Sequence, residues 1–295
     1  MTPSMDSIGI IAGSRSLPLL FARQARTMGV KRIVAVAFHN ETDPQLAALV
    51  DDIVWLKVGQ LSKLISTFTD RGVKNCVMLG QIAPRNLFDI QPDLRAVALL
   101  FRLKEKNART IFGAIGDELK KDGVELIEPT PWLKPWMPED GFVLGPKLKD
   151  EQRQDIEFGF RIAKEVSRLE IGQTVVVKKG TVLAVEGFEG TDACLRRGGG
   201  LAGSGAAVAV KVAREKHDLR FDIPCIGAST LETCREAGIS VLAFEAGMTL
   251  ILERDEVEKL AVKSKISVMA FNSEVTSDVL KAKPAGAPRF TTADS

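Results

Sequence analysis

The sequence predicts a two-domain α/β protein, with an N-terminal Rossmann-like, doubly wound parallel sheet and a C-terminal α/β domain. Apolar strand-like runs alternate with helical segments over residues 1–128, and a proline-rich crossover covers residues 129–149. A second α/β pattern covers residues 150–271. Strands that alternate with helices are typical of parallel sheets, and 295 residues suffice for two separate cores.

The first domain is expected to alternate strands and helices in chain order. The strands are predicted at 8–12, 32–37, 52–56, 75–79 and 124–127, and the helices at 18–28, 59–69, 94–104 and 108–121. In such sheets ligands bind at the carboxyl ends of the strands. We therefore expect three loops to bind substrate, through Gly13 and Ser14, Gly59 and Gln60, and Gly80 and Gln81.

Neither glycine pattern in the chain supports a dinucleotide fingerprint. After the first strand, Arg15 stands where the second glycine of G-x-G-x-x-G would be. A strict match at Gly198, Gly200 and Gly203 follows a helical pattern and precedes a strand, which inverts the required context. We interpret residues 198–205 as a flexible loop over the site, and there is no Walker A sequence.

Composition excludes several classes of protein. A net charge of +2 with scattered basic residues argues against a nucleic-acid-coating protein. The four cysteines lack C-x-x-C spacing, and two histidines make a histidine-rich zinc site improbable. Neither a signal peptide nor a membrane span is visible, so a cytoplasmic protein is expected. The tail over 272–295 lacks periodicity and is predicted to be disordered.

The second domain is expected to open with a helix over residues 150–169. Its strands are predicted at 174–177, 182–185, 207–212 and 241–244, with a tight hairpin turn at Lys178-Lys179-Gly180. Glu186, Glu189 and Asp192 follow the strand at 182–185, with Thr191 placed to cap a short helix. Three carboxylates at a helix start form either a cation site or a solvated cap.

The segment from Asp218 to Ile223 shows a period of two. Asp218, Arg220 and Asp222 alternate with three apolar residues, which predicts a strand with all charges on one face and Pro224 at its end. Such a face suits an anionic ligand with a divalent metal. The alternative is a surface strand with a cross-paired arginine.

Seven segments together resemble one enzyme family, the UDP-2,3-diacylglucosamine pyrophosphatases that are unrelated to calcineurin-like metallophosphoesterases. The resemblance covers residues 8–270 and depends on the order of the segments, because each is short. They are I-I-A-G-S-x-S-L-P from Ile10, G-Q-L-x-K from Gly59, N-L-F-D-I-Q-P-D-L-R from Asn86, the segment Glu186–Arg197, V-K-V from Val210, D-L-R-F-D-x-P-x-I-G from Asp218 and E-A-G-x-T from Glu245.

This resemblance implies hydrolysis of the substrate to 2,3-diacylglucosamine 1-phosphate (lipid X) and UMP in lipid A biosynthesis, with the lipid held between two domains. It also implies a divalent cation, usually Mg²⁺ and alternatively Mn²⁺. The family's essential aspartate falls on Asp222, with Asp218 as the second choice. Arg15, Gln81 and the glycine-rich loop depart from the family pattern, so contacts with the first domain are expected to differ.

We assign roles on that basis. Asp222 is expected to be a metal ligand or water-orienting base, with Asp192 and Glu189 as further metal ligands. Arg220 or Lys211 is expected to pair with phosphate oxygens, and Thr191 to bind substrate.

The expected partner is a lipid-linked nucleotide sugar, with peripheral contact at the inner membrane surface and a homodimer both left open. An apolar groove near Leu87-Phe88 and Trp132–Trp136 is expected to hold the acyl chains. Two rival functions remain: a nucleotide-sugar oxidoreductase, and a carrier that binds lipid or nucleotide without turnover.

Overall fold

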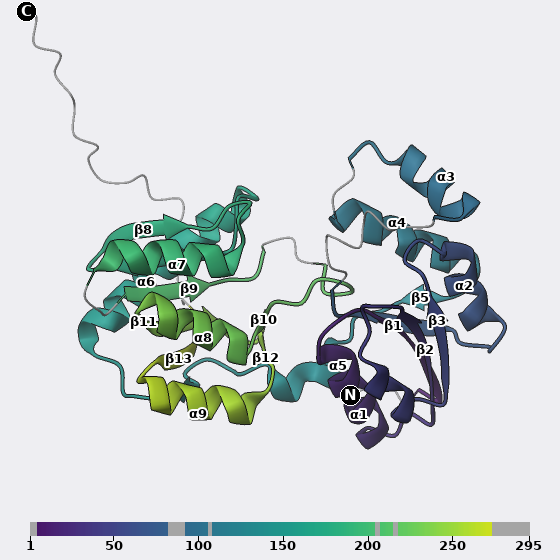
Figure 1. The fold of residues 1–295 in the computed structure, drawn as a ribbon, viewed down its shortest axis with the longest axis horizontal. Helices are drawn as coiled ribbons and strands as arrows, with labels where there is room; N and C mark the ends of the chain where they lie inside the picture. The colour runs from purple at the N-terminus through teal and green to yellow at the C-terminus, as the bar shows by residue number, and fades with distance from the viewer. Residues whose placement is uncertain (1–4, 82–91, 106–107, 204–206, 215–217, 273–295) are drawn as a thin grey trace, which may run out of the picture.

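The computed structural model describes residues 5–81, 92–105, 108–203, 207–214 and 218–272. Its first sheet has the strand order β3-β2-β1-β4-β5, with every pairing parallel, as the sequence predicts (Figure 1). The elements of this part are β1 (Ser7–Ala12), α1 (Leu17–Thr27), β2 (Arg32–Phe38), η1 (Pro44–Ala48), β3 (Asp52–Leu56), α2 (Leu61–Thr69), β4 (Asn75–Leu79), α3 (Leu94–Arg102), α4 (Ala108–Lys121) and β5 (Glu125–Leu126).

The parallel order follows from strands that are apolar on both faces. Ile8 and Ile10 of β1 face the cluster that holds Phe21, whereas Ile11 faces the cluster under α2 and α4. Both clusters bury their members almost fully. A sheet that is covered on both sides needs such continuous apolar strands. The strand order reverses between β1 and β4, and their loops therefore flank the point where doubly wound sheets bind ligands.

The predicted crossover contains short helices, α5 (Thr130–Leu133) and η3 (Lys134–Trp136), and the edge strand β6 (Val143–Leu144). Trp132 is only 1% exposed and its ring meets that of Phe21 at 5.5 Å, edge to face. Trp132 therefore belongs to the core below β1, and it cannot line the open acyl groove that the sequence suggested. Leu87 and Phe88, the other expected groove residues, lie outside the described residues, as do residues 273–295 of the tail.

The second sheet is mixed, with the order β6-β13-β11-β9-β7-β8. Strands β9, β11 and β13 are parallel, whereas β6, β7 and β8 pair antiparallel with their neighbours. The remaining elements are α6 (Asp150–Arg168), β7 (Thr174–Lys178), β8 (Thr181–Val185), α7 (Thr191–Ala202), β9 (Ala207–Lys211), β10 (Cys225–Ile226), α8 (Ala228–Ala237), β11 (Ile239–Glu245), β12 (Leu250–Ile251), α9 (Arg254–Ser264) and β13 (Ser267–Phe271).

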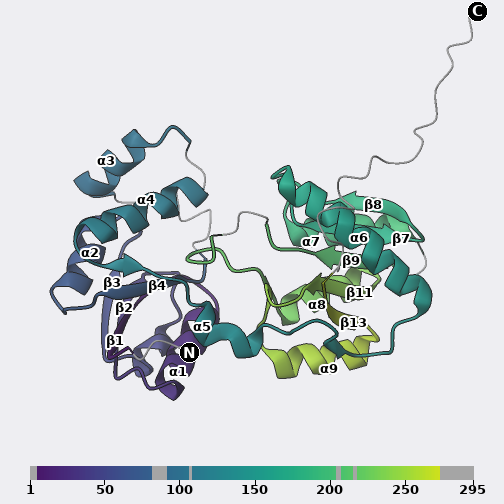
Figure 2. The same cartoon turned by 180° about the vertical axis from the view of Figure 1, so that it is seen from behind.

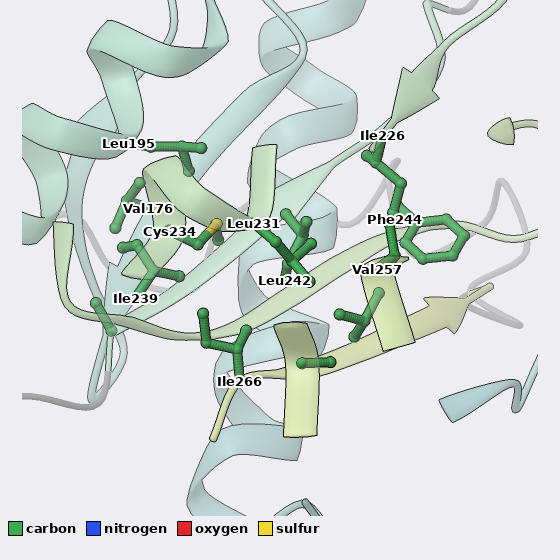
Figure 3. Close-up of a cluster of buried hydrophobic side chains, with 14 of the residues drawn as sticks. Val176, Leu195, Ile226, Leu231, Cys234, Ile239, Leu242, Phe244, Val257 and Ile266 are labelled. Atoms are coloured by element: carbon green, nitrogen blue, oxygen red, sulfur yellow. The ribbon is translucent and has the colours of Figure 1, made fainter. Parts of the chain in front are cut away.

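Two layers of helices cover this sheet. Leu195 of α7, Leu231 of α8 and Val257 of α9 converge on β11 in one buried cluster (Figure 3). Helix α6 covers the other face, through Ile156 and Phe160 (Figure 2). No helix in the described ranges is both long and apolar enough to cross a bilayer.

The two sheets are joined by a small parallel pair, β10 with β12. Leu250 and Leu252 come from the second half of the chain, yet they belong to the same buried cluster as Phe21 and Trp132. Ser16, at the start of α1, adds a hydrogen bond of 3.1 Å from its hydroxyl to Glu253 Oε1. The pair β10/β12 thus fixes the second sheet to the α1 side of the first (Figure 1).

The glycine-rich segment differs from the prediction of a flexible loop, because Gly198, Gly199 and Gly200 lie inside α7. A Cβ atom on Gly198 would come within 2.5 Å of Val176, and one on Gly199 within 1.8 Å of the carbonyl oxygen of Ala237. These glycines therefore let α7 approach β7 and α8 closely. Gly203 ends the helix with φ of 64°, a conformation that favours glycine.

Candidate active site

One edge of the second sheet gathers polar side chains from four elements. Lys211 ends β9 and Glu245 ends β11, at the carboxyl ends of two parallel strands. Strand β7 runs the opposite way, so its first residue, Thr174, pairs with Lys211 in the sheet register. Helix α7 begins at the same edge with Thr191.

A chain of hydrogen bonds links Lys211, Thr191 and Glu186. Lys211 Nζ donates to Thr191 Oγ1 at 3.4 Å, and Thr191 Oγ1 donates to Glu186 Oε1 at 3.1 Å. Lys211 Nζ also lies 3.4 Å from the carbonyl oxygen of Cys225. Glu186 is only 7% exposed, and its second oxygen accepts from the backbone N–H of Gln173 at 3.4 Å. We call Lys211, Thr191 and Glu186 the relay.

The relay changes the interpretation of Thr191. The sequence predicted an N-cap, but the cap position is Gly190, with φ of 82°, and Thr191 is the first helical residue. Its hydroxyl is turned to Lys211 and Glu186 rather than to the next turn of α7. The amino end of α7, which carries partial positive charge, therefore lies beside the ammonium group of Lys211. Together they favour an anion.

Sequence reasoning missed three polar residues at this edge. Thr174 Oγ1 lies 3.4 Å from Thr191 Oγ1. Glu245 pairs with Lys164 of α6 at 2.6 Å and accepts from the backbone N–H of Ala213 at 2.8 Å, which ties the ends of β9 and β11 together. The one available signal was the E-A-G-x-T segment that begins at Glu245.

The segment from Asp218 to Asp222 is a turn, and the predicted strand is wrong. The carbonyl oxygen of Asp218 accepts from the backbone N–H groups of Phe221 and Asp222 at 3.2 and 3.1 Å. Its carboxylate binds the Arg220 guanidinium twice, at 2.8 and 2.6 Å, and the Arg220 backbone N–H at 3.2 Å. Asp218 therefore raises the pKa of Arg220 and holds it in a local pair. The charges do not share one strand face.

This turn lies against the first domain. The Phe221 ring meets Phe112 of α4 with 5.7 Å between ring centroids, and a Cβ on Gly116 of α4 would lie 3.8 Å from Arg220 Nη1. Phe221 also packs on the buried cluster of that domain. The turn thus carries Asp222, which is exposed, to the junction of the two sheets.

Charges from both halves of the chain meet around Cys225. Burial raises the pKa of this thiol to about 12; Lys211 and Arg15 oppose the rise and Asp222 adds to it. Arg15 has φ of 70°, a backbone conformation that glycine adopts without strain. The arginine therefore departs from the family pattern at a position whose backbone suits glycine. Arg15 of the first domain therefore lies near enough to Cys225 to lower its pKa, as Lys211 does.

The loops after β1 and β4 are joined to each other. The backbone N–H groups of Gly13 and Ser14 donate to the carbonyl oxygens of Leu79 and Gln81 at 2.7 and 2.8 Å. The Ser14 hydroxyl also donates to Gln81 O at 2.8 Å. The backbone N–H groups of Gly13 and Ser14 thus already have acceptors, and substrate binding by these two residues stays a prediction. A Cβ on Gly80 would come within 2.4 Å of Ser14 O.

The third expected loop, at Gly59 and Gln60, is likewise tied to its own domain. Gly59 has φ of 100°, and its carbonyl oxygen accepts from Asp93 N at 3.2 Å. Gln60 Oε1 accepts from Lys57 N at 2.9 Å. These contacts fix the start of α2 next to the start of α3.

The three expected metal ligands do not form a protein cage. Among the described residues, no group of three or more His, Cys, Asp or Glu side chains is placed to hold an ion. Glu189 pairs with Arg197 at 2.5 Å, and that guanidinium lowers the pKa of Glu189. Asp192 and Asp222 are both exposed. A Mg²⁺ ion needs only one or two carboxylates when phosphate oxygens and water complete its shell, so a site that uses Asp192 or Asp222 in this way stays a prediction.

The fold and this edge define a two-domain α/β protein with a polar site, built around the relay, at the carboxyl ends of β9 and β11. Residues 7–136 match the model for the LpxI N-terminal domain, and residues 139–269 match the model for the LpxI C-terminal domain. The chain therefore belongs to the LpxI family.

A curated relative supports this assignment. The chain is 28% identical over 263 residues to a Caulobacter vibrioides protein named UDP-2,3-diacylglucosamine pyrophosphatase LpxI, covering 86% of this chain and 93% of that protein. The match thus extends through both domains.

Comparison with solved structures gives much weaker likenesses. The biotin carboxylase domain of a thermophilic 2-oxoglutarate carboxylase matches with a TM-score of 0.25 and 14% identity, over 58% of this chain and 34% of that chain. An N5-carboxyaminoimidazole ribonucleotide synthetase matches with a TM-score of 0.27 and 13% identity, over 65% and 40%. The chain thus spans well under half of either structure.

Proposed function

We propose that the protein hydrolyses the pyrophosphate of UDP-2,3-diacylglucosamine to 2,3-diacylglucosamine 1-phosphate and UMP. Water forms a bond to one phosphorus, the bridging P–O bond breaks, and both products leave as phosphate monoesters. The observation that carries the proposal is the anion-favouring relay at the junction of the sheets, in a chain that matches both LpxI domains. Pyrophosphate cleavage depends mostly on charge neutralisation and a positioned water.

Lys211 is the proposed phosphate-binding residue. Its ammonium group is held by Thr191 and by the Cys225 carbonyl, and Glu186 fixes Thr191 in turn. Arg220 is the weaker candidate, because Asp218 already accepts two hydrogen bonds from its guanidinium. Thr191 then binds substrate through the same hydroxyl that orients Lys211, and the start of α7 adds its partial positive charge.

Asp222 is the proposed catalytic carboxylate, either as the base that orients water or as a ligand of Mg²⁺. Asp222 ends the 218–222 turn, whose Phe221 ring packs on Phe112 of α4, and Asp222 is exposed. Mg²⁺ would supply charge neutralisation of the pyrophosphate, and Asp192 would be its second protein ligand. Glu189 would need to release Arg197 before it could contribute.

The proposed place of action is the cytoplasm, with the substrate bound between the domains. Arg15 would contribute from the first domain, because its charge reaches the same region as Lys211 and Asp222. The loops at Gly13 and Gly80 would then position the sugar or nucleotide by shape, since their joined backbones leave Gly13 and Ser14 N–H groups occupied. A homodimer stays a prediction.

The test is incubation of the purified full chain with UDP-2,3-diacylglucosamine and Mg²⁺, with chromatographic measurement of UMP. UDP-N-acetylglucosamine, which has the same pyrophosphate but no long acyl chains, is the matched control. We expect UMP from the diacylated substrate and far less from the control. Binding without release of UMP would support a carrier. Tight binding of NAD or NADP that competes with substrate would support the oxidoreductase, which the Arg15 position disfavours.

A further inference from the structure

Helix α3 carries an apolar stripe that faces away from the protein. Leu94 is 89% exposed and Phe101 is 83% exposed, and Ala98 between them is also exposed. Spacings of four and three residues place all three on one face of a helix. The opposite face, with Ala96 and Leu99, is buried against the domain. A surface helix normally shows polar residues to solvent, whereas α3 has apolar residues on its exposed face as well as on its buried face. We call Leu94, Ala98 and Phe101 the α3 stripe.

The helix is held firmly, so the exposure of the stripe does not come from a loose end. Asp93 caps α3 by accepting from Ala96 N at 2.9 Å, and its other oxygen accepts from Ser62 N, at the start of α2, at 2.6 Å. Arg95 binds Glu118 of α4 at 2.7 Å. These contacts fix α3 on α2 and α4, at the outer side of the first domain (Figures 1 and 2).

The charges beside the stripe are mainly positive. From Leu94 to Lys104 the sequence has three basic residues and no acidic one, with the capping Asp93 before this stretch and the exposed Glu105 after it. Arg102 is 73% exposed, whereas Glu118, the carboxylate beneath it, is only 12% exposed. Lys104 follows the helix and is exposed. The stripe is therefore flanked by cations that point to solvent.

We propose that α3 docks the protein on an anionic phospholipid membrane, with Leu94 and Phe101 inserted among the acyl chains and Arg102 and Lys104 on the headgroups. Seven residues of helix place the two anchors about 10.5 Å apart along the axis, so both reach the same depth when α3 lies flat. The basic flanks select the occupant: they complement anionic headgroups, whereas a second copy of the stripe would bring like charges together.

The other exposed large apolar residues of the described part are isolated or less exposed than the stripe, such as Leu169 and Ile171 after α6, which are 57% and 52% exposed. Phe188, Leu201 and Val262 are exposed by 108%, 64% and 63%, but each comes from a different element. Phe188 also lies next to Glu186 and Glu189 in sequence, where an anionic surface would be repelled. It is therefore the matched control for an exposed aromatic side chain.

The membrane proposal rests on the proposed function in one respect, because a substrate with two acyl chains resides in a bilayer. The vesicle test described next does not depend on the proposed function. The full chain is sedimented with vesicles of phosphatidylcholine, alone or mixed with phosphatidylglycerol, without substrate. We expect binding to the anionic vesicles, at least about tenfold weaker binding by the double variant Leu94→Gln/Phe101→Gln, and no change with Phe188→Gln.

Three outcomes would overturn the proposal: equal binding by the wild type and the double variant, a melting temperature several degrees lower in the double variant, or a wild-type dimer that the double variant dissociates. The second would mean that the stripe packs on another part of this chain, and the third that it contacts another copy. Turnover of a short-chain, water-soluble substrate separates the two proposals. The double variant should retain that turnover, whereas an inactive wild type would refute only the hydrolase.

Discussion

Replacing Lys211 by Met should lower kcat/KM about tenfold to a hundredfold and leave the fold intact. A hydrogen bond to a charged group contributes about 1.5–3 kcal/mol, and about 1.4 kcal/mol corresponds to a factor of ten. The folded state loses only two long contacts of 3.4 Å, to Thr191 and to the Cys225 carbonyl, so the free energy of unfolding should fall by about 0–1 kcal/mol. Met keeps most of the aliphatic length of the Lys211 side chain, so the packing of that chain at the end of β9 is retained.

The assay is steady-state release of UMP, with the melting temperature measured on the same sample. Lys178→Met is the matched control, because Lys178 also ends a strand of this sheet, is half-buried, and donates to a carbonyl, that of Ala202 at 2.6 Å. It lies at the opposite end of β7 from Thr174. A folded Lys211→Met protein with normal kcat/KM, or an equal loss in the control, would refute the assignment.

Three further predictions concern other residues. Asp222→Ala should lower kcat about a hundredfold or more without changing the melting temperature, because the residue is exposed. A normal kcat would exclude Asp222 as the catalytic carboxylate. Asp192→Ala should have the smaller effect on kcat if Asp192 is only a second metal ligand. Chelation of divalent ions should stop turnover and Mg²⁺ should restore it; undiminished turnover after chelation would contradict the metal. Burial raises the pKa of Asp93, but hydrogen bonds from the N–H groups of Ala96 and Ser62 outweigh burial and bring the pKa below its ordinary value of 3.8. The ionised Asp93 therefore stabilises the folded state at neutral pH, and this stabilisation is lost as the pH falls below 3.8. Asp93→Ala should therefore destabilise the protein by about 1–3 kcal/mol in urea unfolding at neutral pH, and Asp93→Asn by less; no change with Ala would contradict the double cap.

The first sheet could be predicted from the sequence because its pattern is strong and local. Segments such as Ile8–Ala12 are apolar at every position, and each is followed by a helix-forming segment. The second sheet was harder. The antiparallel direction of β7, which brings Thr174 opposite Lys211, depends on tertiary pairing that no local pattern records.

Two wrong predictions have specific physical causes. The alternation from Asp218 to Ile223 is short, and the Asp218 carboxylate instead binds the backbone N–H two residues ahead, a turn that competes with strands. The run Gly198–Gly200 has poor helix propensity, about 1 kcal/mol per glycine, and only the close approach of Val176 and Ala237 explains why it is helical. The turn is set by hydrogen bonds within the segment itself, whereas the helix depends on partners distant from the pattern.

The way β10 and β12 return to the first domain affects how this chain could be divided. The family matches meet between residues 136 and 139, which invites expression of each half alone. Yet Leu250 and Leu252 complete the packing around Phe21 and Trp132. A fragment truncated after residue 136 would present that apolar surface to water, and its missing cover lies more than a hundred residues downstream. We therefore expect neither half to fold stably alone, and chimaeras of this family should exchange both segments together.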